Sequence, residues 1–254
     1  MKLALADLAA LMRIVQVIFA VITCAVGLVN AEDVSVYIHR PVAAEAGGGG
    51  SVAYKDDFDG SESPSQTVTI NYNLTSGTDQ VLTCGVIVRN NDAQTVNSVT
   101  WNGDSLTFVG RSGDLTNSYV EIWYIINPDT GANDFVATLS AASSEVGAAC
   151  ILTTDTNQTT PLGTAVFAED EVTDTIEATV SSASDELVVD FVVQNTAAAS
   201  LTVDASQTER VNVTGISEYD YGMSTEGGAA SVAMTWTSSV ADQYKRIGAV
   251  PIKP

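Results

Sequence analysis

Residues 81–89, VLTCGVIVR, form an apolar run of strand length that sets the pattern for most of the chain. Similar runs rich in Val, Ile, Thr and Tyr recur between clusters of Gly, Asn, Asp, Ser and Pro, at 66–72, 119–126, 134–140, 146–153, 172–181, 186–194, 207–214, 231–237 and 244–252. Short runs bounded by turn residues are typical of an all-β sandwich. No amphipathic helix of useful length appears after residue 31. The sequence therefore predicts one antiparallel β-sandwich domain over residues 52–254.

Two local patterns add detail to this sandwich. Asn102-Gly103 separates VTW from DSLTFV, and this pair favours a two-residue hairpin turn because both positions need a positive φ. Alternation in the run that follows places Tyr119, Glu121 and Trp123 on one face of a strand.

The cysteines allow two interpretations. Cys84 and Cys150 each lie inside an apolar run, and neither has the spacing of a metal ligand. In an exported protein they can form a disulfide between strands. The alternative is a pair of small buried hydrophobic side chains.

A leader pattern precedes the sandwich. Residues 12–31, MRIVQVIFAVITCAVGLVNA, start at an internal methionine, carry Arg13 ahead of an apolar run, and end in Val29-Asn30-Ala31. Small residues at the −3 and −1 positions are typical of a signal-peptidase site.

We therefore predict that residues 1–31 are an apolar, helical signal segment whose true start is Met12. The mature chain would begin at Glu32, outside the cell or on its surface, with no stable membrane insertion after cleavage. The alternative is a retained membrane helix, but the apolar stretch 14–29 is shorter than the ~20 residues that span a bilayer.

Residues 32–51 form a separate unit between the leader and the sandwich. Val34, Val36 and Ile38 alternate with polar or aromatic residues, which indicates a short strand, and GGGGS at 47–51 makes a flexible tether. This strand either folds back onto its own sheet or completes the sheet of a neighbouring copy by β-strand addition. We favour the second interpretation and predict an assembly strand at these three residues.

The charge balance excludes several partners. The chain has 10 Lys and Arg against 31 Asp and Glu, a net charge of −21, and no basic residue lies between Arg111 and Arg210. Such a surface repels the phosphates of nucleic acids and anionic membranes. Copies of the chain also repel one another, so self-assembly would be favoured by salt or divalent cations.

Catalytic constellations are missing from the sequence. His39 is the only histidine, and it precedes the glycine tether rather than lying on a rigid scaffold. A hydrolytic triad, a zinc site and a phosphate-binding loop all lack their residues. Chance carboxylate pairs are abundant and are a weak signal of glycosidase activity. We therefore predict that the protein is not an enzyme.

Calcium is the one cofactor that the sequence suggests. Asp56, Asp57, Asp59 and Glu62 surround Gly60 in DDFDGSE, and hard cations prefer such oxygen ligands. The alternative is a solvated acidic loop. A second, weaker cluster of acidic residues comprises Glu169, Asp170, Glu171 and Asp174.

Three aromatic residues are candidate glycan contacts. Tyr219 and Tyr221 alternate with carboxylates and share a face, and Trp101 adjoins the predicted hairpin turn. Alternatively, the tyrosines form cross-strand pairs.

From about residue 65 to the end, the chain resembles a jelly-roll-like β-sandwich module of exported bacterial and archaeal surface proteins and of phage structural proteins. The resemblance is carried by residues 99–103 (VTWNG), 121–124 (EIWY) with Asn127-Pro128, 159–164 (TTPLGT), 207–210 (QTER) and 249–254 (AVPIKP). It implies a fold and a role in adhesion, glycan binding or structural assembly, without choosing among them.

Together these features predict a secreted, non-catalytic subunit of an extracellular assembly, such as a pilus-like filament or a surface coat, that joins copies of itself by donor-strand exchange. The alternatives are a carbohydrate-binding or adhesive module and a virion capsid or fibre protein.

Overall fold

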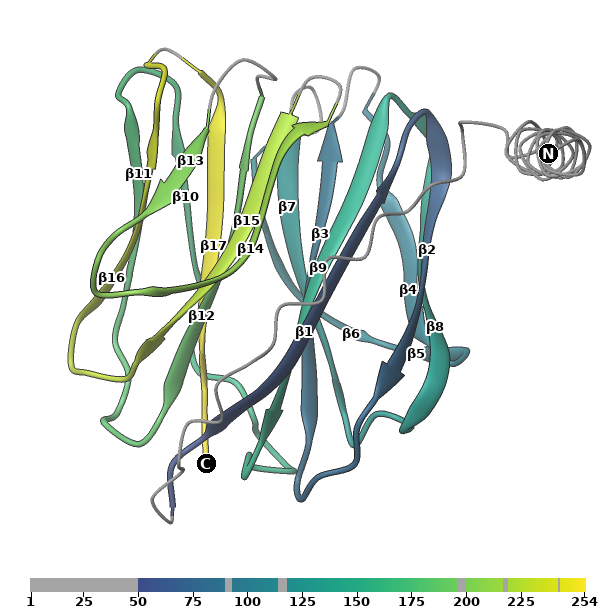
Figure 1. Ribbon diagram of the computed structural model, residues 1–254, viewed down its shortest axis with the longest axis vertical. Coiled ribbons are helices and arrows are strands. Elements are labelled where there is room, and N and C mark those ends of the chain that lie inside the picture. Colours follow the sequence, from purple (N-terminus) through teal and green to yellow (C-terminus); the bar gives the residue numbers. More distant parts are fainter. Residues whose placement is uncertain (1–49, 90–92, 114–117, 196–199, 217–218, 242) are drawn as a thin grey trace, which may run out of the picture. The chain divides into compact units, whose positions relative to one another are not determined.

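The computed structural model describes residues 50–89, 93–113, 118–195, 200–216, 219–241 and 243–254 (Figure 1). Every regular element within these ranges is a β-strand, and the strands pair in antiparallel fashion. The predicted all-β, antiparallel class is therefore confirmed for the described residues. No helix in the described part of the chain could cross a membrane. The predicted signal segment and the assembly strand Val34, Val36 and Ile38 lie outside the described residues.

The strands divide into two successive groups. The first comprises β1 (Ala53–Glu62), β2 (Ser65–Leu74), β3 (Val81–Arg89), β4 (Val96–Trp101), β5 (Asp104–Ser105), β6 (Thr107–Ser112), β7 (Ser118–Ile126), β8 (Gly131–Ser143) and β9 (Glu145–Thr154). The second comprises β10 (Val166–Asp170), β11 (Thr175–Val180), β12 (Leu187–Gln194), β13 (Leu201–Val203), β14 (Thr208–Ile216), β15 (Tyr219–Gly227), β16 (Val232–Ser238) and β17 (Lys245–Ile252). We call these groups repeat 1 and repeat 2.

Each repeat forms one inner and one outer sheet, and the strand orders of the two repeats correspond. The inner sheets are β1-β9-β3-β7-β6 and β10-β17-β12-β15-β14, and the outer sheets are β2-β8-β4-β5 and β11-β16-β13. Strands β1–β4 of repeat 1 correspond in order to β10–β13 of repeat 2, and β6–β9 correspond to β14–β17. The two-residue strand β5 has no counterpart among the described strands of repeat 2. Where the sequence suggested one sandwich, the structure contains two of the same topology.

Three apolar layers hold the four sheets together. In repeat 1, side chains such as Leu82 and Phe135 fill the space between the inner and outer sheets. In repeat 2, Val192 and Trp236 do the same. A third layer lies between the two inner sheets, where Ile122 meets residues of repeat 2. Strands of both inner sheets are therefore buried on both faces.

The two inner sheets pack face to face in opposite order. β1 lies against β14 at one side, β6 lies against β10 at the other, and β7 contacts β12 and β17. An approximate twofold axis along the strands relates the repeats. Gly85 on β3 and Phe191 on β12 occupy equivalent positions, and a Cβ atom on Gly85 would lie 2.3 Å from Phe191 Cδ1. The aromatic ring thus occupies the space that the missing side chain leaves.

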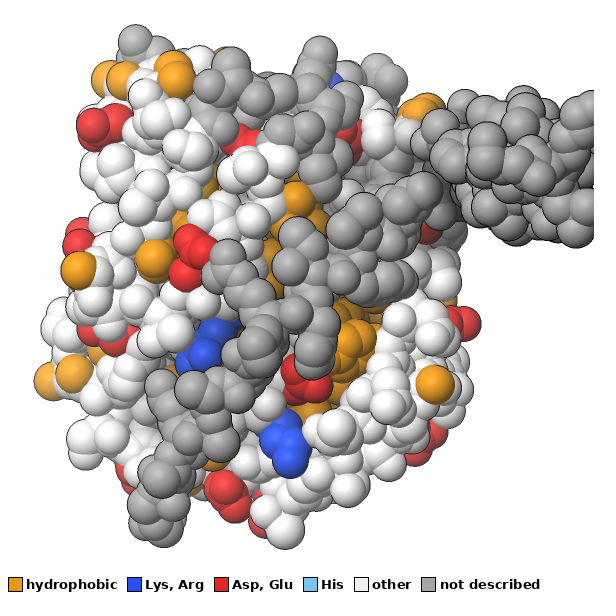
Figure 2. All heavy atoms as spheres, in the orientation of Figure 1, with side chains coloured by type: hydrophobic (Ala, Val, Ile, Leu, Met, Phe, Trp, Pro, Cys, Tyr) orange, Lys and Arg blue, Asp and Glu red, His pale blue; other side chains and the backbone are white. Residues whose placement is uncertain are grey.

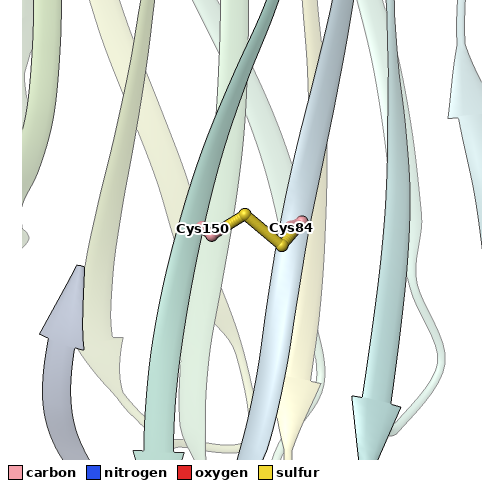
Figure 3. The surroundings of a disulfide bond; sticks show 2 residues. All are labelled: Cys84 and Cys150. Atoms are coloured by element: carbon pink, nitrogen blue, oxygen red, sulfur yellow. A yellow bond between two sulfur atoms is a disulfide. The ribbon is translucent and has the colours of Figure 1, made fainter. Parts of the chain in front are cut away.

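A disulfide links two central strands of repeat 1. Cys84 on β3 faces Cys150 on β9 directly across the strand pair, and the sulfur atoms are bonded (Figure 3). Of the two interpretations of the cysteines, the structure has the disulfide.

Repeat 2 places a carboxylate at the position equivalent to Cys84. Asp190 is 0 % exposed and accepts hydrogen bonds from Trp236 Nε1 at 2.8 Å, Ser224 N at 2.8 Å and Gln207 Nε2 at 3.2 Å. Burial raises the pKa of Asp190 to about 7, although these hydrogen bonds favour the ionised form. A disulfide in one repeat and a buried polar network in the other therefore link strands at equivalent places of the two sandwiches.

Candidate assembly interface at the β1 edge

The acidic stretch proposed as a calcium loop is a strand. Residues of DDFDGSE form most of β1, which pairs with β9 and ends the inner sheet of repeat 1. Phe58 explains why this stretch forms a strand, because its side chain is buried between the two sheets of repeat 1. Residues on either side of it therefore point to alternate faces of the sheet. Gly60 lies within the strand, where a Cβ atom would come 2.9 Å from Ile70 Cγ1.

The strand carries its carboxylates on two faces. Asp57 accepts a hydrogen bond from the Tyr54 hydroxyl, and Asp59 accepts one at 3.1 Å from the Tyr221 hydroxyl of repeat 2. Asp56 and Glu62 instead bond residues of β2, namely the Tyr72 hydroxyl, Ser65 Oγ and the Thr69 N–H. The structure brings Asp57 and Asp59 together and separates both from Asp56 and Glu62.

This arrangement bears on the cation candidates. Among the described residues, no group of three or more His, Cys, Asp or Glu side chains could hold a metal ion. Calcium binding at the β1 carboxylates stays a prediction. The second acidic cluster has cationic partners instead, because Asp170 pairs with Lys245 at 3.3 Å and Glu171 pairs with Arg246 at 2.8 Å.

A seam of aromatic and charged side chains joins β1 to repeat 2. The Arg210 guanidinium of β14 lies 3.7 Å from the centroid of the Tyr54 ring, and its Nε donates to Thr225 Oγ1 at 2.9 Å. Burial raises the pKa of Asp59, and the Tyr221 hydroxyl partly offsets this. The pKa of Tyr54 is raised by burial and by Asp57. These groups fix the position of β1, which ends the inner sheet among the described strands.

Acidic side chains are frequent along β1. Asp56 Oδ1 accepts the backbone N–H of Asp57 at 3.0 Å, which occupies one donor of the edge strand. Charged residues on an edge strand hinder unspecific pairing with other chains. Figure 2 shows the face that carries β1 and β14, where apolar side chains are visible between polar ones and basic side chains are few.

The proposed glycan contacts are buried. Trp101, Tyr219 and Tyr221 are each 0 % exposed. The Trp101 indole N–H donates to the Asp129 carbonyl at 2.7 Å, and the tyrosine rings stack on each other with their centroids 5.8 Å apart. These three residues therefore belong to the core and offer no ring face to a sugar.

The hairpin turn beside Trp101 forms as predicted. Asn102 has a φ of 51° and Gly103 a φ of 87°, and Trp101 pairs with Asp104 across the turn.

Sequence reasoning missed two residues of the seam, Tyr54 and Arg210. Tyr54 lies three residues before Asp57, and a bulge between Tyr54 and Asp56 puts Tyr54 and Asp57 on the same face. A regular strand would instead put Tyr54 and Asp57 on opposite faces, so their contact could not be predicted without knowing of the bulge. Arg210 reaches Tyr54 only because the repeats pack face to face.

No protein-family model, curated protein or solved structure matches the chain. Inference about function therefore rests on the geometry described above and on the sequence.

Proposed function

We propose that this chain is an exported, non-catalytic structural subunit that joins copies of itself into an extracellular filament or surface coat. Residues 32–46 of one copy would add as a strand to the β1 edge of the next. The observation that carries the proposal is the position of β1. Among the described strands it ends an inner sheet, and it begins at Ala53, three residues after the last glycine of the tether at 47–50.

The chain enters the sandwich from a fixed point. Val52 is buried, and its N–H donates to the Asp185 carbonyl of repeat 2 at 3.0 Å. From Val52, the segment back to His39 can extend by about 45 Å if fully stretched. The glycines within it leave its direction free. Residues 32–38 can therefore reach a second copy.

The proposed donor has the pattern of an added strand. Glu32 and Asp33 precede the strand 34–38, and His39 and Arg40 follow it. Val34, Val36 and Ile38 would cover one face of the added strand.

The architecture of each repeat supports a structural role. The strand orders β1-β9-β3-β7 and β2-β8-β4-β5 of repeat 1 support our proposal of a jelly-roll-like sandwich, a fold that occurs in capsid and lectin domains. A disulfide in repeat 1 and the buried polar network of Asp190 in repeat 2 brace the described part of the chain. Such a braced block suits a repeating assembly.

Deletion of residues 32–46 tests the proposal. We expect the truncated protein to fold as a soluble monomer and to lose all higher-order assembly, because the donor strand is gone while Val52 and β1 remain. Negative-stain images and sedimentation of the purified mature protein, with and without the deletion, measure this. A synthetic peptide of residues 32–46 should cap the growing ends of the intact protein.

Point variants provide the matched control. The triple change of Val34, Val36 and Ile38 to Ser should abolish assembly, whereas Ser35→Ala on the opposite face should preserve it. If the deletion instead yields an unfolded monomer and the intact protein has no higher-order state, the strand is intramolecular and the proposal fails.

Salt should strengthen the assembly. Because each copy carries a net charge of −21, repulsion between copies falls as the Debye length shrinks from about 30 Å at 0.01 M to about 10 Å at 0.1 M salt. We expect the critical concentration for assembly to fall over this range. A further fall with CaCl2 beyond that with MgCl2 at equal ionic strength would indicate a calcium site. An assembly that dissolves as salt rises would show that attraction between charges dominates the interface.

A further inference from the structure

An aromatic pair lies partly exposed on the inner sheet of repeat 1. Phe108 on β6 faces Trp123 on β7, with the ring centroids 5.0 Å apart and the planes at 57°. The Phe108 side chain is 48 % exposed, the most exposed aromatic side chain in the described part of the chain, and Trp123 is half-buried. The pair lies on the face that the outer sheet of repeat 1 covers elsewhere.

A buried ion pair fixes the indole of Trp123. Glu121 is 1 % exposed, its Oε1 accepts Nε and Nη2 of Arg111 at 2.8 and 2.5 Å, and its Oε2 accepts Trp123 Nε1 at 2.9 Å. Burial raises the pKa of Glu121, and Arg111 opposes this. Burying an ion pair costs free energy unless the charged groups also make well-formed hydrogen bonds, as Glu121 does here. The result is an indole of fixed orientation beside a guanidinium that is 27 % exposed.

Repeat 2 shows that the fold does not require this array. Strand register pairs the four residues of this array with non-aromatic residues of repeat 2: Phe108 with Glu209, Arg111 with Asn212, Glu121 with Gly222 and Trp123 with Ser224. Trp236 of the outer sheet packs there instead, where a Cβ atom on Gly222 would lie 2.6 Å from its Cη2. One repeat fills this space as core, and the other presents aromatic rings at the surface.

We propose that Phe108, Trp123 and Arg111 form a binding site for a neutral glycan. A pyranose ring has an apolar C–H face that stacks on an exposed aromatic ring and hydroxyl groups that bond a planar, charged donor. Binding sites combine such aromatic surface with a few fixed polar groups. Arg111 uses Nε and Nη2 on Glu121, which leaves Nη1 for a hydroxyl. The net charge of −21 disfavours anionic sugars. The proposal does not depend on self-assembly.

Intrinsic fluorescence tests this directly, because the chain has three tryptophans and two of them, Trp101 and Trp236, are 0 % exposed. A ligand at the site should change the emission of Trp123 alone. The probes are neutral tetrasaccharides of glucose, mannose, galactose and N-acetylglucosamine, titrated into the mature protein. We expect saturable binding of at least one probe.

Phe108→Ala should weaken that binding at least tenfold without changing the melting temperature by more than a few degrees. The matched control is Tyr244→Ala, which removes an aromatic ring of 39 % exposure in repeat 2 and should leave binding unchanged. No emission change with any neutral probe, equal binding by Phe108→Ala, or tighter binding of a sulfated tetrasaccharide would each overturn the proposal.

Discussion

Phe191→Ala is expected to lower the free energy of unfolding by about 3–5 kcal/mol, the usual cost of truncating a buried phenylalanine. The ring is 0 % exposed and fills the space above Gly85 at the centre of the two inner sheets. Its loss leaves a cavity that two stiff sheets cannot close. Urea unfolding followed by circular dichroism should show a lower midpoint with little change in slope.

Two further variants test the twofold relationship. Gly85→Val should also destabilise strongly, because its Cβ atom would meet the ring of Phe191. Since Gly85 and Phe191 are equivalent positions, the exchange Gly85→Phe with Phe191→Gly should recover part of the stability that Phe191→Gly alone loses. The exposed Phe108→Ala is the control. An exchange that is no better than the sum of its single changes would contradict the twofold packing.

Asp190→Ala should cost about 3 kcal/mol or more, because it leaves the buried donors of Trp236, Gln207 and Ser224 without their acceptor. Urea unfolding at fixed pH measures this loss. The corresponding change at the other repeat, Cys84→Ala with Cys150→Ala, removes a disulfide and leaves no buried donor unpaired, so the two results separate the polar network from the cross-link.

The ionisation of Asp190 makes stability depend on pH. Its pKa is about 7 in the native state, whereas the ordinary value of 3.8 applies to the unfolded chain, so between these values the native state binds the proton more strongly. The contribution of Asp190 is therefore greatest below about pH 4 and is lost as the pH rises through about 7. Free energies of unfolding at pH 5 and pH 8 should differ less in Asp190→Asn than in the original protein. An equal difference would show that other groups cause the pH dependence.

Most strands could be predicted from the sequence because they are apolar. The run Val81–Arg89 matches β3 at both ends, and the Asn102-Gly103 turn forms as its φ requirement indicates. Two of the strands that were missed, β1 and β10, carry several acidic residues, so their composition resembles that of a loop. Only Phe58, buried in the middle of β1, reveals the strand.

The repeat was hidden because its halves share a pattern rather than residues. Residues 79–89 and 185–195 align without a gap, yet Cys84 meets Asp190 and Gly85 meets Phe191 in that alignment. The burial of Trp101, Tyr219 and Tyr221 could not be predicted from the sequence either, because it depends on which sheets face each other. Local spacing places side chains on a face, and only the packing of the repeats decides whether that face meets solvent.

The central claim is that the strand around Val36 pairs with β1 of another copy. The most direct measurement places a photocrosslinking amino acid at position 36, mixes 15N-labelled and unlabelled protein before assembly, and maps the cross-linked peptides by mass spectrometry. We predict cross-links from position 36 to residues 53–62 that include mixed heavy and light pairs. Cross-links that join only peptides of the same isotope composition would show that the strand folds onto its own chain, and would contradict the account.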